Sequence, residues 1–412
     1  MISYNEALKI LQREITPLAA QNGSPGNWLG GVTATAVDSA SAVPAFGNSA
    51  MDGFALRSTD TATASPSSPV ELDVWGTIAA GDAPLDGSCP AGAAEIMTGA
   101  IVPPGCDAIV PLERVEFSES GRTKKVRLTA PVTAGQNLRK AGEDFQSGQT
   151  VLGGGTLIEP HHIMALAATG IRSAPIRPAP RVSVITTGAE LADADAPARA
   201  GMIQDANGPY LRAVLDRMGA TIVQQVRVAD AAGDIEAAIA DCAQSSDIVL
   251  TTGGVSAGRY DLVPSIVTST GGETLFHKVS IRPGKPVLGA RLSDGTLLIG
   301  LPGNPVAAAV CMRFIAIPAL RMLRGQSAES FHAAVTTTRI TKRSELYFFG
   351  KARAGVDVGG QLKVEMLPGQ ESFKVSPLAN ANCWAIVRDG TDEISAGDLI
   401  KIAPLYPASF LQ

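Results

Sequence analysis

One pattern recurs from residue 181 to about residue 325: a short apolar strand, a Gly-rich turn and then a helix. Two clear copies of the strand and its turn are Arg181-Val-Ser-Val-Ile-Thr-Thr-Gly188 and Asp247-Ile-Val-Leu-Thr-Thr-Gly-Gly254. Parallel strands need long crossover connections, which are usually helices, so this alternation favours a parallel sheet. We therefore expect a central α/β unit with helices on both faces of the sheet.

The rest of the chain has a different character. A length of 412 residues exceeds one ordinary core, so two to four domains are expected. Ser3 and Glu6 have capping-box spacing and predict a first helix. Short β-type segments separated by Gly, Pro, Asp and Ser dominate residues 31–128, and β-type segments return after Gly325. We expect a small β-rich domain in the first region and a β-barrel or sandwich in the last.

Composition narrows the classes of partner and location. A formal charge of −5 lacks the surplus of Lys and Arg that a general nucleic-acid binder needs. The five cysteines stand far apart, which argues against a zinc ribbon or a dense disulfide framework. The first residues, Met1-Ile-Ser-Tyr-Asn-Glu, do not form a signal-peptide pattern, and Arg and Pro residues interrupt the apolar run 306–323. We therefore expect a cytoplasmic protein that binds neither membranes nor nucleic acid.

Several turns of the α/β segment lie at the carboxyl ends of strands, where open α/β sheets bind their ligands. Thr252, Gly253, Gly254 and Ser256 would offer hydroxyls and backbone N–H groups to an anion. In Pro302-Gly-Asn-Pro305, Asn304 is an N-cap and Pro305 the first residue of a helix whose N–H groups would face the same crevice. Each turn alone could be only a tight connection, but their convergence at one edge favours an anion site.

Charged residues are expected around this edge. Arg282 and Lys285 lie on one stiff turn and would supply positive charge to an anion. Acidic residues also gather here: Glu190, Asp205, Asp230 and Asp261. Acids facing a polyanion make sense if Mg²⁺ bridges the two. Asp205 and Asp230 are equally explained as caps or turn residues, so Glu190 and Asp261 are the preferred metal ligands.

Six motifs in order carry a family resemblance. They are Pro44-Ala-Phe-Gly-Asn-Ser-Ala-Met-Asp-Gly-Phe-Ala55, Ile96-Met-Thr-Gly-Ala100, Asn137-Leu-Arg-Lys-Ala-Gly-Glu-Asp144, Thr252-Gly-Gly-Val-Ser256, Arg282-Pro-Gly-Lys-Pro286 and Leu301-Pro-Gly-Asn-Pro305. Together they resemble the MoeA and gephyrin E-domain family. The resemblance implies an α/β multidomain protein with a central parallel α/β sandwich of the molybdopterin-binding type (residues 1–22 and 178–325). It also implies a linker subdomain (23–44 and 145–177), a β-rich inserted domain (45–144) and a C-terminal β-barrel-like domain (326–412).

The resemblance further implies an activity. Members of the family are molybdopterin molybdenumtransferases, which use Mg²⁺ to insert molybdate into adenylylated molybdopterin and release AMP with the molybdenum cofactor. A homodimer is implied, in which the inserted domain reaches the partner's central domain, together with possible partners from the same cofactor pathway. The implied catalytic residues are Asp52, Thr98, Glu190, Asp230, Asp261, Lys278, Arg282 and Lys285, with Glu190 and Asp261 as metal ligands. The implied substrate-binding residues are Arg139, Asp144, Thr252, Gly253, Gly254, Ser256, Pro302, Gly303, Asn304, Pro305 and Ser372.

Two departures from the family pattern keep other functions open. Ala307 stands where a Ser is frequent, and the segment 345–353 fits an Arg-rich motif only in part, so that Lys351 and Arg353 would have to replace its cations. A non-catalytic molybdopterin-binding or scaffold protein of the same family is therefore the alternative to the enzyme. An enzyme of the same fold that acts on another nucleotide-linked substrate is a third hypothesis.

Overall fold

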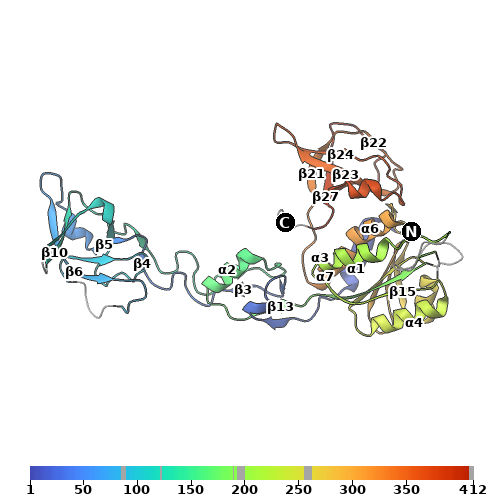
Figure 1. Ribbon diagram of the computed structural model, residues 1–412, viewed down its shortest axis with the longest axis horizontal. Coiled ribbons are helices and arrows are strands. Elements are labelled where there is room, and N and C mark those ends of the chain that lie inside the picture. The colour runs from blue at the N-terminus through green and yellow to red at the C-terminus, as the bar shows by residue number, and fades with distance from the viewer. Residues whose placement is uncertain (85–89, 121–122, 189, 193–199, 255–261, 408–412) are drawn as a thin grey trace.

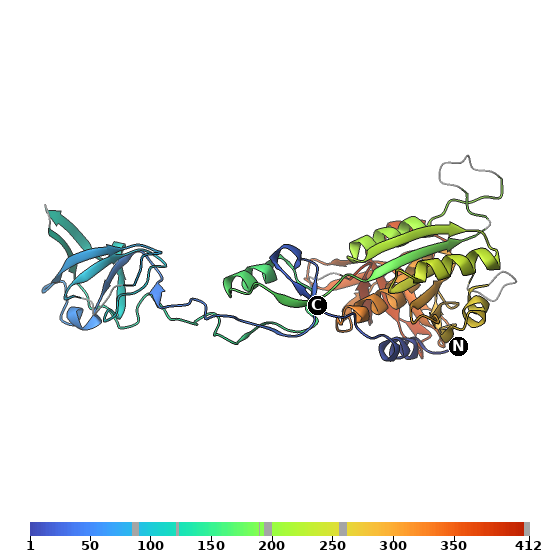
Figure 2. The same cartoon turned by 90° about the horizontal axis from the view of Figure 1, so that it is seen from below.

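The structure is a computed structural model that describes residues 1–84, 90–120, 123–188, 190–192, 200–254 and 262–407. Figures 1 and 2 show an elongated molecule with a β-rich lobe at one end and a larger α/β lobe at the other. A small lobe lies between them, and a second β-lobe packs on the α/β lobe. The first helix belongs to the α/β lobe, so the chain runs out to the distal lobe and returns.

The α/β lobe is built on a six-stranded sheet with the order β15-β14-β16-β20-β19-β17. Its strands are β14 (Arg181–Thr187), β15 (Thr221–Val228), β16 (Ile248–Thr252), β17 (Glu273–His277), β19 (Leu288–Arg291) and β20 (Leu297–Leu301). The first four strands of the order are parallel, as the sequence predicts. The sheet continues beyond these parallel strands, because β19 and β17 pair antiparallel and form a hairpin-like extension beside β20.

Helices cover both faces of this sheet, which confirms the α/β class. One face packs against α1 (Tyr4–Glu14), α3 (Asn207–Arg217), α6 (Pro305–Cys311) and α7 (Ile317–Leu323). The other face packs against α4 (Ala232–Ala243) and α5 (Val263–Ser269). Neighbouring residues of β14 alternate accordingly: Val184 enters the first core and Ile185 the second. Helix α1 begins as its sequence predicts, because the Ser3 side chain accepts a hydrogen bond from the Glu6 amide at 3.2 Å.

The apolar run after Pro305 forms a nearly continuous helix, α6 and α7 joined by a π-helical turn at Met312–Ala316. It is long and apolar enough to span a membrane, but 89% of its 18-residue window is buried within the protein. Arg313 interrupts the run and is itself buried, where it pairs with Glu329 at 2.7 Å. The segment is therefore a core helix between the sheet and the C-terminal lobe.

The distal and middle lobes are small and consist mainly of β-structure. The distal sheet has the order β8-β5-β7-β6-β10-β9, with β5 (Gly53–Leu56), β6 (Val70–Ile78), β7 (Ala93–Ile96), β8 (Ala108–Pro111), β9 (Glu116–Ser120) and β10 (Thr123–Leu128). The pair β4 (Asn48–Ser49) and β11 (Leu138–Arg139) lies at its base. The middle lobe contains β1 (Gln21–Gly23), β2 (Val32–Thr33), β3 (Val37–Asp38), β12 (Thr150–Leu152), β13 (Ala174–Arg177) and α2 (Pro160–Ala168).

The C-terminal lobe is a closed five-stranded barrel, which decides between the barrel and the sandwich in favour of the barrel. Its strands follow the order β23-β24-β21-β27-β25, and β25 closes on β23. They are β21 (His332–Thr336), β23 (Tyr347–Val356), β24 (Leu362–Met366), β25 (Cys383–Val387) and β27 (Leu399–Pro404), with a side pair β22 (Ile340–Thr341) and β26 (Glu393–Ile394) and a short helix α8 (Ser376–Ala379). Strand β18 (Ile281–Arg282) leaves the α/β lobe and pairs with β23, which fastens the barrel to it.

Candidate functional site

A cavity of about 580 Å³ opens at the carboxyl edge of the four parallel strands. The turns after β14, β16 and β20 line it, together with Asp230 after β15. Strand β14 is followed by α3 on one face and its neighbour β16 by α5 on the other, so the two strands form the topological switch point of the sheet. Connections that diverge at such a point leave a crevice, which is where α/β folds bind ligands.

Glycine lets two of these turns pack closely. Gly253 has φ +93, and a Cβ at this position would lie 2.6 Å from Thr187 Oγ1 and 2.7 Å from the Thr187 carbonyl oxygen. A Cβ on Gly303 would lie 3.8 Å from the Gly253 Cα, so the turn after β20 reaches the turn after β16. The backbones of three successive strand ends therefore meet on one wall of the cavity, and a side chain at Gly253 would separate them.

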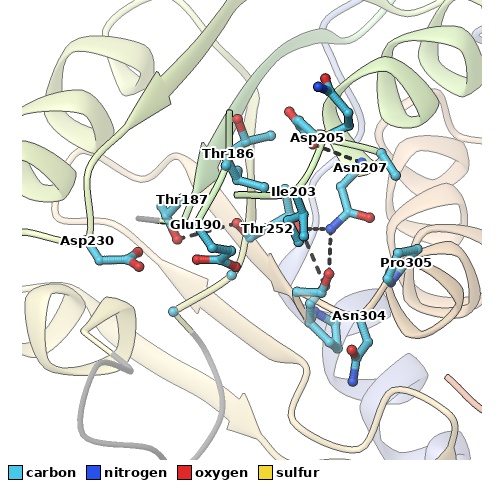
Figure 3. A pocket seen from close by; sticks show the side chains of 18 of the residues that line it. Thr186, Thr187, Glu190, Ile203, Asp205, Asn207, Asp230, Thr252, Asn304 and Pro305 are labelled. Carbon is cyan, nitrogen blue, oxygen red and sulfur yellow. Dashed lines mark hydrogen bonds between the residues drawn. The ribbon is translucent and has the colours of Figure 1, made fainter. Parts of the chain in front are cut away.

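Asn207 holds these turns together. Its Nδ2 donates hydrogen bonds to Thr252 Oγ1 and to the Gly303 carbonyl oxygen, each at 2.8 Å (Figure 3). Its own amide and that of Gly208 donate to Asp205 Oδ1 at 2.9 Å, which agrees with the interpretation of Asp205 as a cap or turn residue. The contacts that let Asn207 join the two turns depend on the order of the strands in the sheet.

The start of α6 forms part of the cavity wall, with Asn304 as N-cap and Pro305 in the first turn. The expectation that its first-turn N–H groups face the crevice is only partly met. Pro305 has no N–H, and the Val306 amide donates to the Ser372 carbonyl oxygen at 2.9 Å. Asn304 Nδ2 also donates to Ser372 Oγ, at 3.2 Å. A loop of the barrel therefore satisfies part of the helix terminus and brings Ser372 to the rim.

The charged groups that line the cavity are acidic. Glu190, Asp205 and Asp230 line it, and in Figure 3 the carboxylates of Glu190 and Asp230 point toward each other. Among the lining residues that the structure describes, none is Lys or Arg. An anionic ligand would meet the negative charge of these carboxylates, which a bound cation could neutralise. Oxygen atoms of carboxylates and of hydroxyls such as Thr187 are the donors that Mg²⁺ prefers.

The turn that carries Arg282 and Lys285, residues 282–286, lies beside this cavity. Of its residues only Pro286 lines the cavity, while Arg282 and Lys285 are exposed. The Arg282 guanidinium lies over the Phe348 ring, 5.9 Å from its centroid, and so leans toward the barrel. Lys278 precedes the turn with φ +67, and its amide donates to the Val287 carbonyl oxygen.

Asp52 and Thr98 form a pair on the distal lobe, far from the cavity of the same chain (Figure 1). Asp52 Oδ1 accepts hydrogen bonds from the Thr98 amide at 2.6 Å and from its hydroxyl at 2.7 Å. These bonds, the backbone one most, lower the pKa of the exposed Asp52 carboxyl. The pair is thus a preformed acidic site that lies apart from the other predicted catalytic residues that the structure describes in its own chain.

The remaining predicted residues lie elsewhere. Arg139 is in β11, and the Asp144 amide donates to the Val43 carbonyl oxygen, both near the base of the distal lobe. Ser256 and Asp261 lie outside the described residues. The contacts of Lys351 and Arg353 do not support the hypothesis that they replace missing molybdate-binding cations. Lys351 is buried and donates to the backbone carbonyls of residues 371 and 374. Arg353 donates to the carbonyl of Asn380.

A second group of metal-donor atoms lies in the middle lobe, at Glu159, His161 and His162. His162 Nδ1 accepts a hydrogen bond from the Glu159 amide at 3.0 Å and thereby caps helix α2. With Nδ1 as the acceptor, a neutral imidazole carries its proton on Nε2, so neither nitrogen of His162 is free to bind a metal while the cap is intact. Capping therefore explains His162 without a metal.

Comparisons with known proteins agree with this arrangement. Three family models match successive parts of the chain: the MoeA N-terminal region (domains I and II) over residues 2–170, a probable molybdopterin-binding domain over 183–322, and the MoeA C-terminal region (domain IV) over 333–405. The second model spans the strands and turns that line the cavity.

Relatives match over almost the whole length. The molybdopterin molybdenumtransferase of Synechococcus elongatus is 34% identical over 412 residues, which cover 98% of this chain and all of that protein. The enzyme of the same name from Bacillus subtilis is 34% identical and covers 87% of this chain and 84% of its own. A crystal structure of the molybdopterin biosynthesis MoeA protein from Pyrococcus horikoshii superposes with a TM-score of 0.82 at 25% identity, covering 98% of this chain and 100% of that chain. From the order of its lobes to the turns of its cavity, this chain belongs to the MoeA family.

Proposed function

We propose that this protein is a molybdopterin molybdenumtransferase, which inserts molybdate into adenylylated molybdopterin with Mg²⁺ and releases AMP and the molybdenum cofactor. The observation that carries the proposal is the cavity at the β14–β16 switch point, where Gly-rich turns and carboxylates meet. The function named for full-length relatives at 34% identity supports it.

The cavity fits a divalent cation. Glu190 and Asp230 offer carboxylate oxygens to this space, and none of its lining residues that the structure describes is Lys or Arg. Mg²⁺ is typically held by one or two carboxylates and by the phosphates of its substrate. When bound, the ion would neutralise the diphosphate and polarise its phosphoanhydride bond. We assign Glu190 to this role, with Asp230 nearby and Asp261 as a further ligand.

The protein's own groups would mainly position the substrate and neutralise its charge. The dithiolene sulfurs of the substrate are the nucleophiles toward molybdate, so no Ser or Cys nucleophile is needed from the chain. The turns at Gly253 and Gly303 let the ligand approach the backbone, and Asn207 fixes the distance between them. Lys278, Arg282 and Lys285, on and before the turn that ends at Pro286, would attract the molybdate and the diphosphate.

We further propose that the working unit is a cytoplasmic homodimer. Asp52 and Thr98 lie on the distal lobe, whereas Glu190 lies in the α/β lobe of the same chain. A second copy related by a two-fold axis could bring its Asp52–Thr98 pair to this cavity, and the same axis would complete two sites at once. Exposed apolar side chains flank the pair, since Met51 is 41% exposed and Met97 38%. Such side chains on the rim of an acidic pair suit a protein interface.

The activity is tested by mixing the purified protein with adenylylated molybdopterin and Mg²⁺, with and without molybdate, and measuring AMP. Molybdate-dependent AMP release is expected. Glu190→Gln should lower the rate by about 100-fold or more, since it removes charge at the reacting diphosphate. Glu236→Gln, which changes an exposed Glu on α4, is the matched control and should leave the rate unchanged. No AMP from the unchanged protein would contradict the proposal.

A further inference from the structure

Phe373 combines exposure with a place in the wall of the cavity. Its side chain is 61% exposed, yet it lines the same cavity as Gly253 and Asn304. It comes from a loop of the C-terminal barrel, between β24 and α8, and not from the α/β lobe that supplies the other lining residues. It belongs to none of the hydrophobic cores of the described chain. Its position therefore has no explanation in the packing of this fold.

The loop that carries Phe373 is held firmly from within the barrel. Lys351 is only 1% exposed, and its Nζ donates to the Glu371 carbonyl oxygen at 3.1 Å and to the Lys374 carbonyl oxygen at 3.0 Å. Gln370 exchanges hydrogen bonds with the Lys351 backbone at 2.9 and 2.8 Å. A buried ammonium is retained only where its hydrogen bonds are made, so Lys351 fixes the backbone on both sides of Phe373.

The same loop is also seated on the α/β lobe. The Ser372 carbonyl oxygen accepts from the Val306 amide at 2.9 Å, and Ser372 Oγ accepts from Asn304 Nδ2 at 3.2 Å. Phe373 is the next residue along the chain. Its backbone is thus placed at the rim by contacts to the helix that forms the cavity wall, while its ring remains open to solvent.

A rigidly mounted aromatic ring at the mouth of a polar cavity suits a planar ligand. Aromatic side chains stack on heterocyclic bases, and little conformational entropy is lost when the backbone is already fixed. We infer that Phe373 is a stacking platform for a planar heterocycle of the substrate, whose pterin and adenine rings share this chemistry. The inference rests on the proposed function for its substrate. It adds a binding residue from the barrel to a site otherwise built from the α/β lobe.

Steady-state kinetics test the inference. Phe373→Ala should raise the KM for adenylylated molybdopterin by about 5- to 150-fold, the range that corresponds to the loss of one stacked ring, and leave the KM for molybdate unchanged. Phe373→Trp should retain the affinity. Val375→Ala is the matched control, because Val375 is exposed on the same loop but does not line the cavity, and it should leave both KM values unchanged. An unchanged KM in Phe373→Ala would overturn the inference.

A binding readout independent of activity uses Phe373→Trp as a fluorescent reporter. Trp28 and Trp384 are buried and Trp75 lies in the distal lobe, so the unchanged protein serves as the blank. Saturable quenching of the new tryptophan by AMP, by free pterin or by both is expected, and the arm that quenches identifies the ring. Quenching by neither would overturn the inference. Quenching without molybdate-dependent AMP release would leave it standing while refuting the proposed function. Dissociation of the dimer by Phe373→Ala, measured by sedimentation, would instead assign Phe373 to a subunit contact and overturn it.

Discussion

Replacing Gly253 by Ala tests how closely the turns of the cavity depend on each other. Gly253 has φ +93, which L-residues rarely adopt, and the added methyl would lie 2.6 Å from Thr187 Oγ1 and 2.7 Å from the Thr187 carbonyl oxygen. A hydroxyl can rotate away, but the carbonyl belongs to the backbone of the last residue of β14. The turn at Gly253 or the one at Thr187 must therefore move.

The magnitude follows from two separate costs. A positive φ costs an L-residue about 1–2 kcal/mol, and forcing a methyl into a filled space costs about 1–3 kcal/mol more. Gly295 isolates the first cost, because it has φ +91 and a Cβ there would meet nothing within 4 Å. Gly295→Ala should therefore destabilise the α/β lobe by about 1–2 kcal/mol, and Gly253→Ala by about 2–5 kcal/mol. A shift of about 1 Å in the cavity wall should also lower turnover by about 100-fold, only in Gly253→Ala.

The assay compares both variants with the unchanged protein in molybdate-dependent AMP release and in chemical unfolding followed by circular dichroism. Gly295→Ala should release AMP at the normal rate despite its lower stability. If Gly253→Ala matched Gly295→Ala in both stability and rate, the close packing of the two turns would have no consequence, and the reasoning would be refuted.

Three further changes probe other parts of the molecule. Thr98→Val removes the hydroxyl bond to Asp52 but keeps the amide bond, so the lowered pKa of the Asp52 carboxyl should rise. The carboxyl loses its charge as the pH falls through its pKa, so the acid limb of the AMP-release profile should move to higher pH. An unmoved limb would exclude Asp52 from the reaction. Glu329→Ala leaves Arg313 charged and buried, which should cost about 3–5 kcal/mol in urea unfolding, whereas the apolar pair Arg313→Met with Glu329→Leu should recover most of the loss. Asn207→Ala removes two hydrogen bonds of 2.8 Å between neighbouring turns and should cost about 1–3 kcal/mol and slow AMP release; normal activity would show that the clasp is dispensable.

The sequence predicted the central parallel sheet and the edge where its turns meet. Gly253 and Asn304 could be brought together in advance because both follow apolar strands, and the carboxyl ends of parallel strands share one edge. The antiparallel strands β17 and β19 were missed because short apolar segments look alike whichever way they run. Strand β23 is hard to recognise because its first six residues are all buried, so the alternation that identifies a half-buried strand is absent.

Contacts between lobes could not be read from local patterns. Ser372 caps the helix at Val306 across two lobes, and nothing in either segment indicates the other. The bonds of Asn207 to Thr252 and Gly303 follow only from the order of the strands. The roles of the predicted site residues stay predictions, since they depend on a ligand and on a second subunit.

The central claim is that the substrate occupies the cavity at the β14–β16 switch point. The most direct test is anomalous scattering from molybdenum in crystals of the protein soaked with adenylylated molybdopterin and molybdate. The account predicts a molybdenum peak within reach of Gly253, Asn304 and the turn that ends at Pro286. A peak elsewhere, such as the separate cavity between α1 and the barrel around Leu8 and Phe331, with the switch-point cavity empty, would contradict it.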